Sequence, residues 1–238
     1  MLDPRAVGTA LLRALFHDDG FDAVVTLPRR SLPEASRWRA PPAAHWRRAK
    51  KPVMAEPTDD ILRARVRWSR PGLPRPDAIE IPGPGQESVW SYPRPPRFEP
   101  CVHPVRVLFG NEVIAHSSTA LRLLETSHPP TYYVPPGDVT WAWLERAAGT
   151  SMCEWKGAAS FWTVRVGDRV ATRAAWSYGD PFPEFAALRD HVAFYCAAMD
   201  ACLVGGERAE PQSGGFYGGW ITAHVVGPFK GGPGTSSW

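Results

Sequence analysis

A carboxylate and an ammonium group lie two residues apart in the stretch 152–157, at Glu154 and Lys156. This stretch is predicted to be a strand, so the two side chains face the same side of it, roughly 6–7 Å apart. Cys153 and Trp155 then face the core. In a cleft, Glu154 and Lys156 could work as an acid–base pair or clamp a polar ligand. On an exposed strand face they would form a solvated ion pair of little energetic value.

A histidine is the next candidate for proton transfer. His128 precedes Pro129 and Pro130, which keep its backbone extended and outside a helix. A fixed imidazole beside Tyr132 would suit proton transfer, because histidine titrates near neutral pH. The alternative is a loop histidine that bonds a main-chain carbonyl. His191 is expected to end a helix, where its cation would interact with the helix dipole in a structural role.

The most distinctive string is 214–220, in which four glycines surround Phe216 and Tyr217. Glycine permits backbone angles that other residues resist and allows a ligand to approach closely. The string lacks the ending of a Walker loop, and no helix clearly follows it as a dinucleotide fingerprint requires. We expect it to form one wall of a ligand pocket, with Tyr217 or Trp220 stacking on a flat or cationic group. The alternative is a tight crossing loop packed on its own aromatics.

Aromatic side chains offer a second hypothesis for the pocket. A non-catalytic aromatic cage would draw on four indoles, from Trp155, Trp162, Trp176 and Trp220. Aromatics that alternate along strands are more often part of a core, so this interpretation competes with simple packing. The expected ligand-contacting residues are Tyr132, Trp176, Tyr178, Tyr217 and Trp220.

Other chemistries find less support in the sequence. The four cysteines, Cys101, Cys153, Cys196 and Cys202, are scattered without a C-x-x-C pair and are expected to be buried free thiols. A nucleophile elbow of the G-x-S-x-G type is missing. No metal and no cofactor are expected, and the partner we expect is a small molecule.

The elements that must position these residues are short. The 26 prolines and 11 tryptophans indicate many turns and aromatic packing. A hairpin is predicted at 105–114 around a Gly-Asn turn, and residues 121–125 are ambiguous between helix and strand. A short helix is expected from Asp138 through Leu144, and Phe185, Leu188 and Val192 form one helical stripe. Further strands are predicted at 131–134, 152–157, 160–166, 169–175, 192–195 and 202–204.

The preceding part of the chain differs in composition. Residues 28–53 hold eight Lys/Arg and one Glu, a net +7 within a chain of net +3, so the remainder carries −4. This basic stretch could contact nucleic acid or acidic lipid. Neither nucleic acid nor a membrane is expected to bind the core domain. A helix at 7–15 and a strand at 21–27 are plausible before it. We interpret residues 1–53 as a largely disordered extension and hypothesise a misassigned start, since an ordinary composition begins at Met54.

The remaining boundaries follow the prolines and aromatics. Residues 54–87 form a Pro-rich linker, in which prolines rule out a long helix, and the aromatic stretch 88–92 is expected to lie as a strap across the domain. A single β-rich domain is predicted for 88–232, with a tail at 233–238. No apolar run reaches the roughly 18 residues that a membrane span needs, and a secretory pattern is missing, so a cytoplasmic protein is expected.

Five motifs occur in order along this domain: ETSHPPTYY at 125–133, CEWKG at 153–157, AWSY at 175–178, HVAFY at 191–195 and GGFYGGW at 214–220. Together they resemble the bacterial and fungal domain-of-unknown-function 427 family over about residues 87–232. The resemblance implies a mainly β fold of the β-tent or Mss4-like class, with two antiparallel sheets around a cleft. The zinc knuckles common in that class are missing, so no structural zinc is expected. The family's label suggests nucleotidyl transfer, but a paired-carboxylate metal motif and a Lys-bearing phosphate loop are both missing.

Three functions from different classes fit these observations. The first is an enzyme or enzyme-like pocket for a small polar molecule, with Lys156 as anchor, Glu154 and His128 as proton handlers and Tyr217 as a wall. The second is a non-catalytic aromatic-cage module. The third is a protein-interaction domain that uses edge strands and the strap.

Overall fold

The structure is a computed structural model that describes residues 56–238. The helix, the strand and the disordered extension expected within residues 1–53 lie outside the described residues. The described part is mainly β and is built from several antiparallel sheets, as the sequence predicts. None of its helices is long and apolar enough to cross a membrane.

The described chain begins with a helix that the linker interpretation of residues 54–87 missed. α1 (Asp59–Ser69) follows Thr58, whose side-chain oxygen accepts a hydrogen bond from the main-chain N–H of Ile61 (3.5 Å). Two aspartates in its first turn and Arg67 in its last turn complement the helix dipole. The helix ends before Pro71, so the prolines limit its length without excluding it.

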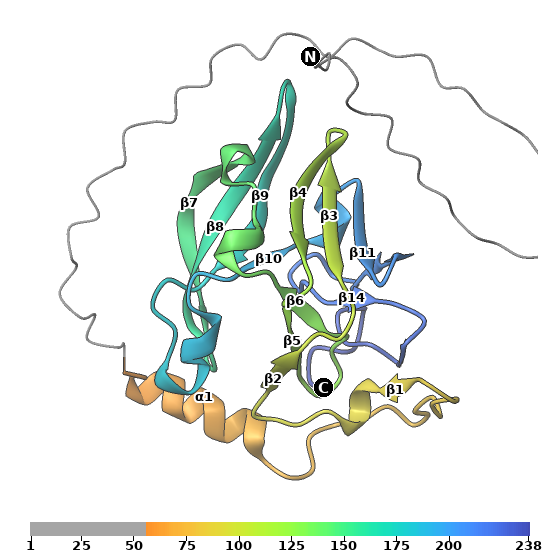
Figure 1. Cartoon of the computed structure of the whole chain (residues 1–238). Helices are drawn as coiled ribbons and strands as arrows, with labels where there is room; N and C mark the ends of the chain where they lie inside the picture. The colour runs from red at the N-terminus through yellow and green to blue at the C-terminus, as the bar shows by residue number, and fades with distance from the viewer. Residues whose placement is uncertain (1–55) are drawn as a thin grey trace, which may run out of the picture. The chain divides into compact units, whose positions relative to one another are not determined.

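Two antiparallel sheets of four strands form the framework (Figure 1). The first has the order β10-β9-β8-β7 and consists of β7 (Leu144–Cys153), β8 (Gly157–Val166), β9 (Arg169–Ser177) and β10 (Val192–Phe194). The second has the order β12-β11-β3-β4 and consists of β3 (Val105–Phe109), β4 (Glu112–Ser117), β11 (Ala201–Val204) and β12 (Glu207–Arg208). The turn at Gly110 and Asn111 has positive φ at both residues, which confirms the predicted β3–β4 hairpin.

Three smaller sheets complete the described part. The segment with the ambiguous pattern is a strand, in a sheet of β2 (Arg97–Pro100), β5 (Leu121–Leu124) and β6 (Thr131–Tyr133). The glycine-rich loop is closed by pairing of β13 (Glu210–Pro211) with β14 (Trp220–Ile221). The strap begins with β1 (Glu87–Ser88), which pairs in parallel with β15 (Val225–Val226).

The helix expected from Asp138 through Leu144 is wrong. Two separate 3-10 turns, Pro136–Asp138 and Trp141–Trp143, occupy this part of the chain. Asp138 is the last residue of the first turn, so it caps no helix. Leu144 already belongs to β7, because strand pairing with β8 extends the backbone from this residue.

The helical stripe expected around Phe185 is also wrong in part. Phe185 and Leu188 are buried on a 3-10 turn, Pro183–Leu188. Val192 lies instead on β10, where it pairs with Ser177 of β9. Sheet pairing therefore overrides the helical spacing of these three apolar residues.

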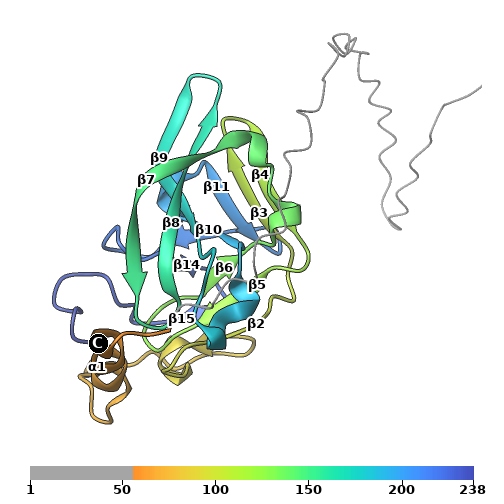
Figure 2. The ribbon, with the colours of Figure 1, turned by 90° about the vertical axis from the view of Figure 1, so that its left-hand side faces the viewer.

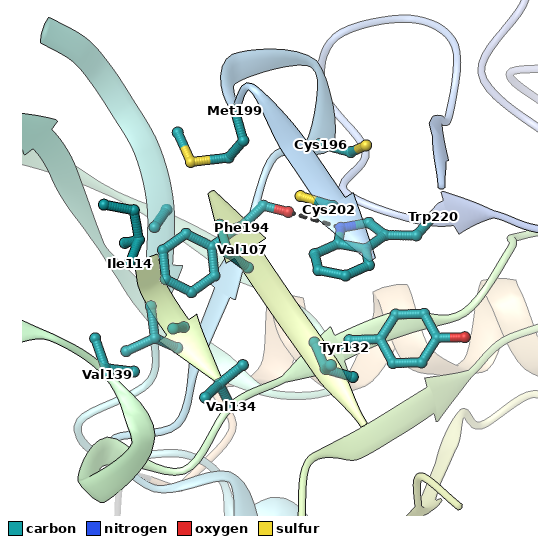
Figure 3. Packing of buried hydrophobic residues seen from close by; sticks show 14 of the residues in the cluster. Val107, Ile114, Tyr132, Val134, Val139, Phe194, Cys196, Met199, Cys202 and Trp220 are labelled. Atoms are coloured by element: carbon teal, nitrogen blue, oxygen red, sulfur yellow. Dashed lines mark hydrogen bonds between the residues drawn. The ribbon is translucent and has the colours of Figure 1, made fainter. Parts of the chain in front are cut away.

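The largest core cluster surrounds the indole of Trp220, which is completely buried (Figure 3). Its Nε1 donates a hydrogen bond to the main-chain oxygen of Phe194 (2.9 Å), and the ring of Tyr132 lies 5.1 Å from it. Val107 of β3 and Ile114 of β4 belong to the same cluster. Tyr132 and Trp220, which we expected to contact a ligand, thus pack the core.

Candidate ligand pocket

A cavity of about 800 Å³ opens beside the first sheet. Side chains from β8 and β9, the turn between β7 and β8, the segment 125–131 and the loop 211–219 line it. This volume is typical of small-molecule pockets, which measure about 300–1,000 Å³. Segments far apart in the sequence therefore converge on one site.

The turn between β7 and β8 carries the expected acid–base pair. Glu154, Trp155 and Lys156 form this turn, and Gly157 has a φ of 98°, so the strand predicted across 152–157 is wrong at 154–156, although Met152 and Cys153 end β7 and Gly157 begins β8. Arg65 of α1 holds the turn by donating from Nε to the oxygen of Glu154 (2.6 Å) and from Nη2 to that of Trp155 (3.3 Å). Both views place α1 at this end of the sheet (Figures 1 and 2).

The turn directs Glu154 and Lys156 to different neighbours. Lys156 is buried and interacts with Cys153, Tyr133 and Glu125, whereas Glu154 is half-buried and interacts with Tyr217. The strand alternation that placed Cys153 on the core side does not apply, and this thiol lines the cavity. Glu154 and Lys156 therefore line the same pocket but interact with different residues.

Lys156 is a buried ammonium group in an aromatic setting. Burial alone would lower the pKa of Lys156, but the neighbouring Cys153, Tyr133 and Glu125 raise it above its usual value. Its Nζ lies 6.0 Å from the centre of the Tyr178 ring. Burial raises the pKa of both Tyr133 and Tyr178, so their hydroxyls stay protonated and can donate hydrogen bonds.

Basic side chains outnumber carboxylates around the cavity. Four cations and two carboxylates line it, which leaves a surplus of two positive charges. The cations are Arg94, Lys156, Arg173 and Lys230, and the carboxylates are Glu125 and Glu154.

Glu125 is the half-buried carboxylate of this charge cluster. Its Oε1 lies 3.4 Å from Nε of Arg94, and its side chain is 20% exposed. Burial raises the pKa of Glu125, but His128, Lys156, Arg94 and Lys230 outweigh burial and hold that pKa below its usual value. One ionised carboxylate is thus shared by three buried or nearly buried cations.

Lys230 approaches the cavity from the C-terminal segment. Its side chain is buried, and its Nζ lies 4.4 Å from the centre of the Trp68 ring of α1. Nζ also donates a hydrogen bond to a main-chain oxygen of Trp238 (2.5 Å). Burial and the nearby Arg94 lower the pKa of Lys230. Trp68, which lies outside 88–232, therefore also lines the pocket, and the domain boundaries themselves stay a prediction.

His128 lies beside Tyr217 and not beside Tyr132 as expected. The two rings meet edge to face with centres 4.7 Å apart, and Nδ1 of His128 lies 2.9 Å from Nε2 of Gln212. Burial lowers the pKa of His128 to about 4, with Lys230 adding to the effect and Glu125 opposing it. The imidazole is therefore neutral near pH 7, with one ring nitrogen that donates and one that accepts.

The glycine-rich loop packs tightly on the indole of Trp176. A Cβ added at Gly218 would lie 2.0 Å from Cη2 of Trp176, so only glycine fits there. Trp176 in turn packs against Tyr195, with ring centres 4.5 Å apart. Tyr217 lines the cavity beside these rings, whereas Phe216 is 71% exposed. The glycine-rich loop therefore forms a wall of the pocket and also packs tightly on aromatic side chains.

The structure brings together six of the eight predicted site residues, Glu154, Lys156, His128, Trp176, Tyr178 and Tyr217. Tyr132 and Trp220 lie in the core instead. The four-tryptophan cage does not form, because Trp162 packs against Trp141 and Trp220 is buried elsewhere. Sequence reasoning missed the charged and polar residues Arg94, Glu125, Tyr133, Gln212 and Lys230, although the first motif, at 125–133, already contains Glu125 and Tyr133.

The comparisons with known proteins bear on the part of the chain that builds this pocket. No curated protein matches the chain. The model of one family, described as "Domain of unknown function (DUF427)", matches residues 97–205. This range includes Glu125, His128 and the turn with Lys156, whereas Tyr217 and Lys230 lie beyond it. The chain therefore carries a domain of the DUF427 family over residues 97–205.

Proposed function

We propose that the pocket binds a small organic molecule with an acidic group, of which a flat carboxylic acid is the simplest example. The observation that carries the proposal is that three cations removed from water, Arg94, Lys156 and Lys230, line the cavity with only two carboxylates, while the fourth cation, Arg173, is exposed. Charge that is removed from water is costly unless an opposite charge compensates it. A bound carboxylate would supply that compensation.

Unused hydrogen-bond donors support the same class of ligand. Nε1 of Trp155 is buried without a hydrogen-bond partner, and Nε of Arg94 is buried with an ion-pair contact to Glu125 (3.4 Å) but no hydrogen bond; both residues line the cavity. Buried donors without an acceptor are rare in folded proteins. Lys156 adds an ammonium group and Tyr178 a hydroxyl that stays protonated. A ligand rich in acceptor oxygens fits this set of donors better than a ligand rich in donors.

The aromatic wall favours a flat apolar body next to the acidic group. The Trp176 ring lies 4.5 Å from that of Tyr195 and 6.3 Å from that of Tyr133. Offset and edge-on contacts of this kind extend readily to a planar ligand. Within the proposal, Lys156 anchors the acidic group, Tyr217 forms a wall, and Glu154 is the group that accepts or returns a proton if a reaction follows binding.

The remaining expectations are proposals of the same kind. The two sheets of four strands are the natural counterparts of the two sheets in the β-tent, or Mss4-like, arrangement. The observation that only two of four indoles line the cavity speaks against the aromatic-cage alternative.

Calorimetric titration of the full chain tests the proposal with three ligands of one shape. Benzoate carries the acidic group, benzamide is its neutral analogue and benzylamine is the matching cation. We expect benzoate to bind most tightly and benzylamine not to bind. Inorganic phosphate serves as a probe for an anion without the flat body. If benzylamine binds as tightly as benzoate, or if benzoate and phosphate both fail to bind, the proposal is wrong.

A further inference from the structure

Gln212 joins three segments at the edge of the pocket. It follows β13, its side chain is buried, and its main-chain N–H donates to the oxygen of Gly219 (3.0 Å). Its side chain makes three contacts: Oε1 accepts from the N–H of Gly219 (3.1 Å), and Nε2 lies 2.7 Å from the oxygen of Lys230 and 2.9 Å from Nδ1 of His128. These contacts use the hydrogen-bonding capacity of the amide almost completely.

The two main-chain partners fix which way the amide points. The N–H of Gly219 can only donate, so it must face the amide oxygen of Gln212. The carbonyl of Lys230 can only accept, so it must face the amide nitrogen. A flipped amide would set donor against donor at Gly219 and acceptor against acceptor at Lys230, which excludes that orientation.

The fixed amide decides where His128 carries its proton. One hydrogen of Gln212 Nε2 goes to Lys230, so the other points at Nδ1 of His128, which must accept it with a lone pair. The single proton of the neutral ring then resides on Nε2. No acceptor from residues 56–238 bonds this nitrogen, and His128 lines the cavity.

We propose that Gln212 is a positioning residue that holds His128 in the neutral form protonated on Nε2, so that the ring offers the ligand an N–H donor instead of a base. The inference rests on the proposed function and sharpens it. The ligand should place a carboxylate or carbonyl oxygen at His128. A ligand with an amino group there is disfavoured, because its N–H would face the N–H of His128 Nε2.

The charged surroundings act in the same direction. Burial disfavours the imidazolium form, the three cations Arg94, Lys156 and Lys230 disfavour it further, and only Glu125 favours it. Protonation would also place a second N–H against Nε2 of Gln212. The ring of Tyr217 contacts His128 edge to face and carries no charge that would offset these effects.

Local packing leaves little room for a different arrangement. A Cβ added at Gly219 would lie 2.5 Å from Oε1 of Gln212 and 2.6 Å from the oxygen of Pro129. The loop can thus approach the amide only because residue 219 is glycine. Close packing on both sides holds the amide at the position from which it reaches His128.

Nitrogen NMR of the ring of His128 tests the proposal on the full chain without ligand. We expect a pyridine-like Nδ1 and a pyrrole-like, protonated Nε2 between pH 5.5 and 8. A proton on Nδ1, or an imidazolium signal at neutral pH, would overturn the proposal. Because no ligand is present, this result is independent of whether benzoate binds, so it separates the inference from the proposed function.

The variant Gln212→Glu adds a functional readout. The carboxylate can only accept, so it should move the ring proton to Nδ1 and raise the pKa of His128 by about 1–3 units. Benzoate binding, flat with pH in the wild type, should then strengthen as the pH falls through that raised pKa. The control Gln86→Glu makes the same chemical change outside the cavity lining and should leave the nitrogen signals of His128 unchanged. An unchanged ring in a folded Gln212→Glu protein refutes the positioning role.

Discussion

Removing the ammonium of Lys156 is the most direct perturbation of the pocket. In the variant Lys156→Met, a side chain of similar length keeps the volume but loses the charge. Lys156 is 7% exposed and lies in a turn whose main chain is held by Arg65, so the backbone of the turn should persist. The expected result is a selective loss of benzoate binding in a variant that still folds but is less stable than the wild type.

The magnitude follows from the kind of contact that is lost. A hydrogen bond to a charged group contributes about 1.5–3 kcal/mol, and each 1.4 kcal/mol is a tenfold change in affinity. The affinity for benzoate should therefore fall about 10- to 150-fold. Benzamide carries no charge and should lose much less. The free energy of unfolding should fall, because the neighbours that hold the pKa of Lys156 above its usual value stabilise the folded chain through its charge, and Met removes that charge.

Calorimetric titration of wild type and variant with both ligands measures these effects, and urea denaturation measures stability. The control Arg165→Met removes the same charge from an exposed ion pair with Glu145 (2.8 Å), outside the cavity lining, and should leave benzoate binding unchanged. Equal affinity of benzoate for wild type and a folded Lys156→Met protein would refute the anchor role. An equal loss for benzamide would show that the side chain shapes the cavity and does not pair with the acidic group.

Three further predictions concern pH, loop packing and the core. Since the pKa of His128 is lowered to about 4, the unfolded chain takes up a proton first as the pH falls. The free energy of unfolding should drop by about 2 kcal/mol between pH 7 and 5, and urea titrations of His128→Gln should show a smaller drop. The variant Gly218→Ala places a Cβ 2.0 Å from the Trp176 ring, so it should lower the free energy of unfolding by about 1–3 kcal/mol and shift the tryptophan emission. The control Gly137→Ala places its Cβ where no atom lies within 4 Å and should change neither quantity. Trp220→Phe leaves a cavity and deprives the main-chain oxygen of Phe194 of the indole donor that now lies 2.9 Å away. Thermal unfolding should therefore show a free energy of unfolding lower by about 2–5 kcal/mol.

Most strands after residue 104 could be predicted, because their signals are local. Alternating apolar residues and the turn at Gly110 and Asn111 specify the β3–β4 hairpin within a dozen residues of sequence. The helix α1 was missed because the prolines that follow it dominate the composition of the stretch 55–103, although Thr58 and two aspartates mark its start. The 3-10 turn near Phe185 was mistaken for a helix, because three apolar residues at helical spacing do not reveal that Val192 pairs with β9.

The faces of the candidate site residues were predicted from the two-residue spacing of a β-strand. That spacing applies only where the chain forms a strand. Glu154 and Lys156 do reach one pocket, but through a turn, so the alternation that assigned their faces was wrong. Gly157, with a φ of 98°, was the local signal for that turn. Lys230 carries no local signal at all, because only tertiary folding brings it to the charge cluster around Glu125.

The pocket is a property of the whole described domain and not of the family segment alone. Residues 97–205 supply the charged side chains of Glu125 and Lys156 and the neutral imidazole of His128. Gln212, which fixes the proton of His128, and Lys230, which adds a buried cation, come from beyond that segment. Strand pairing at β13–β14 returns this part of the chain to the pocket. A chain that shared only the family segment would thus keep the anchor but lose the groups that set which oxygen-bearing ligand fits beside it.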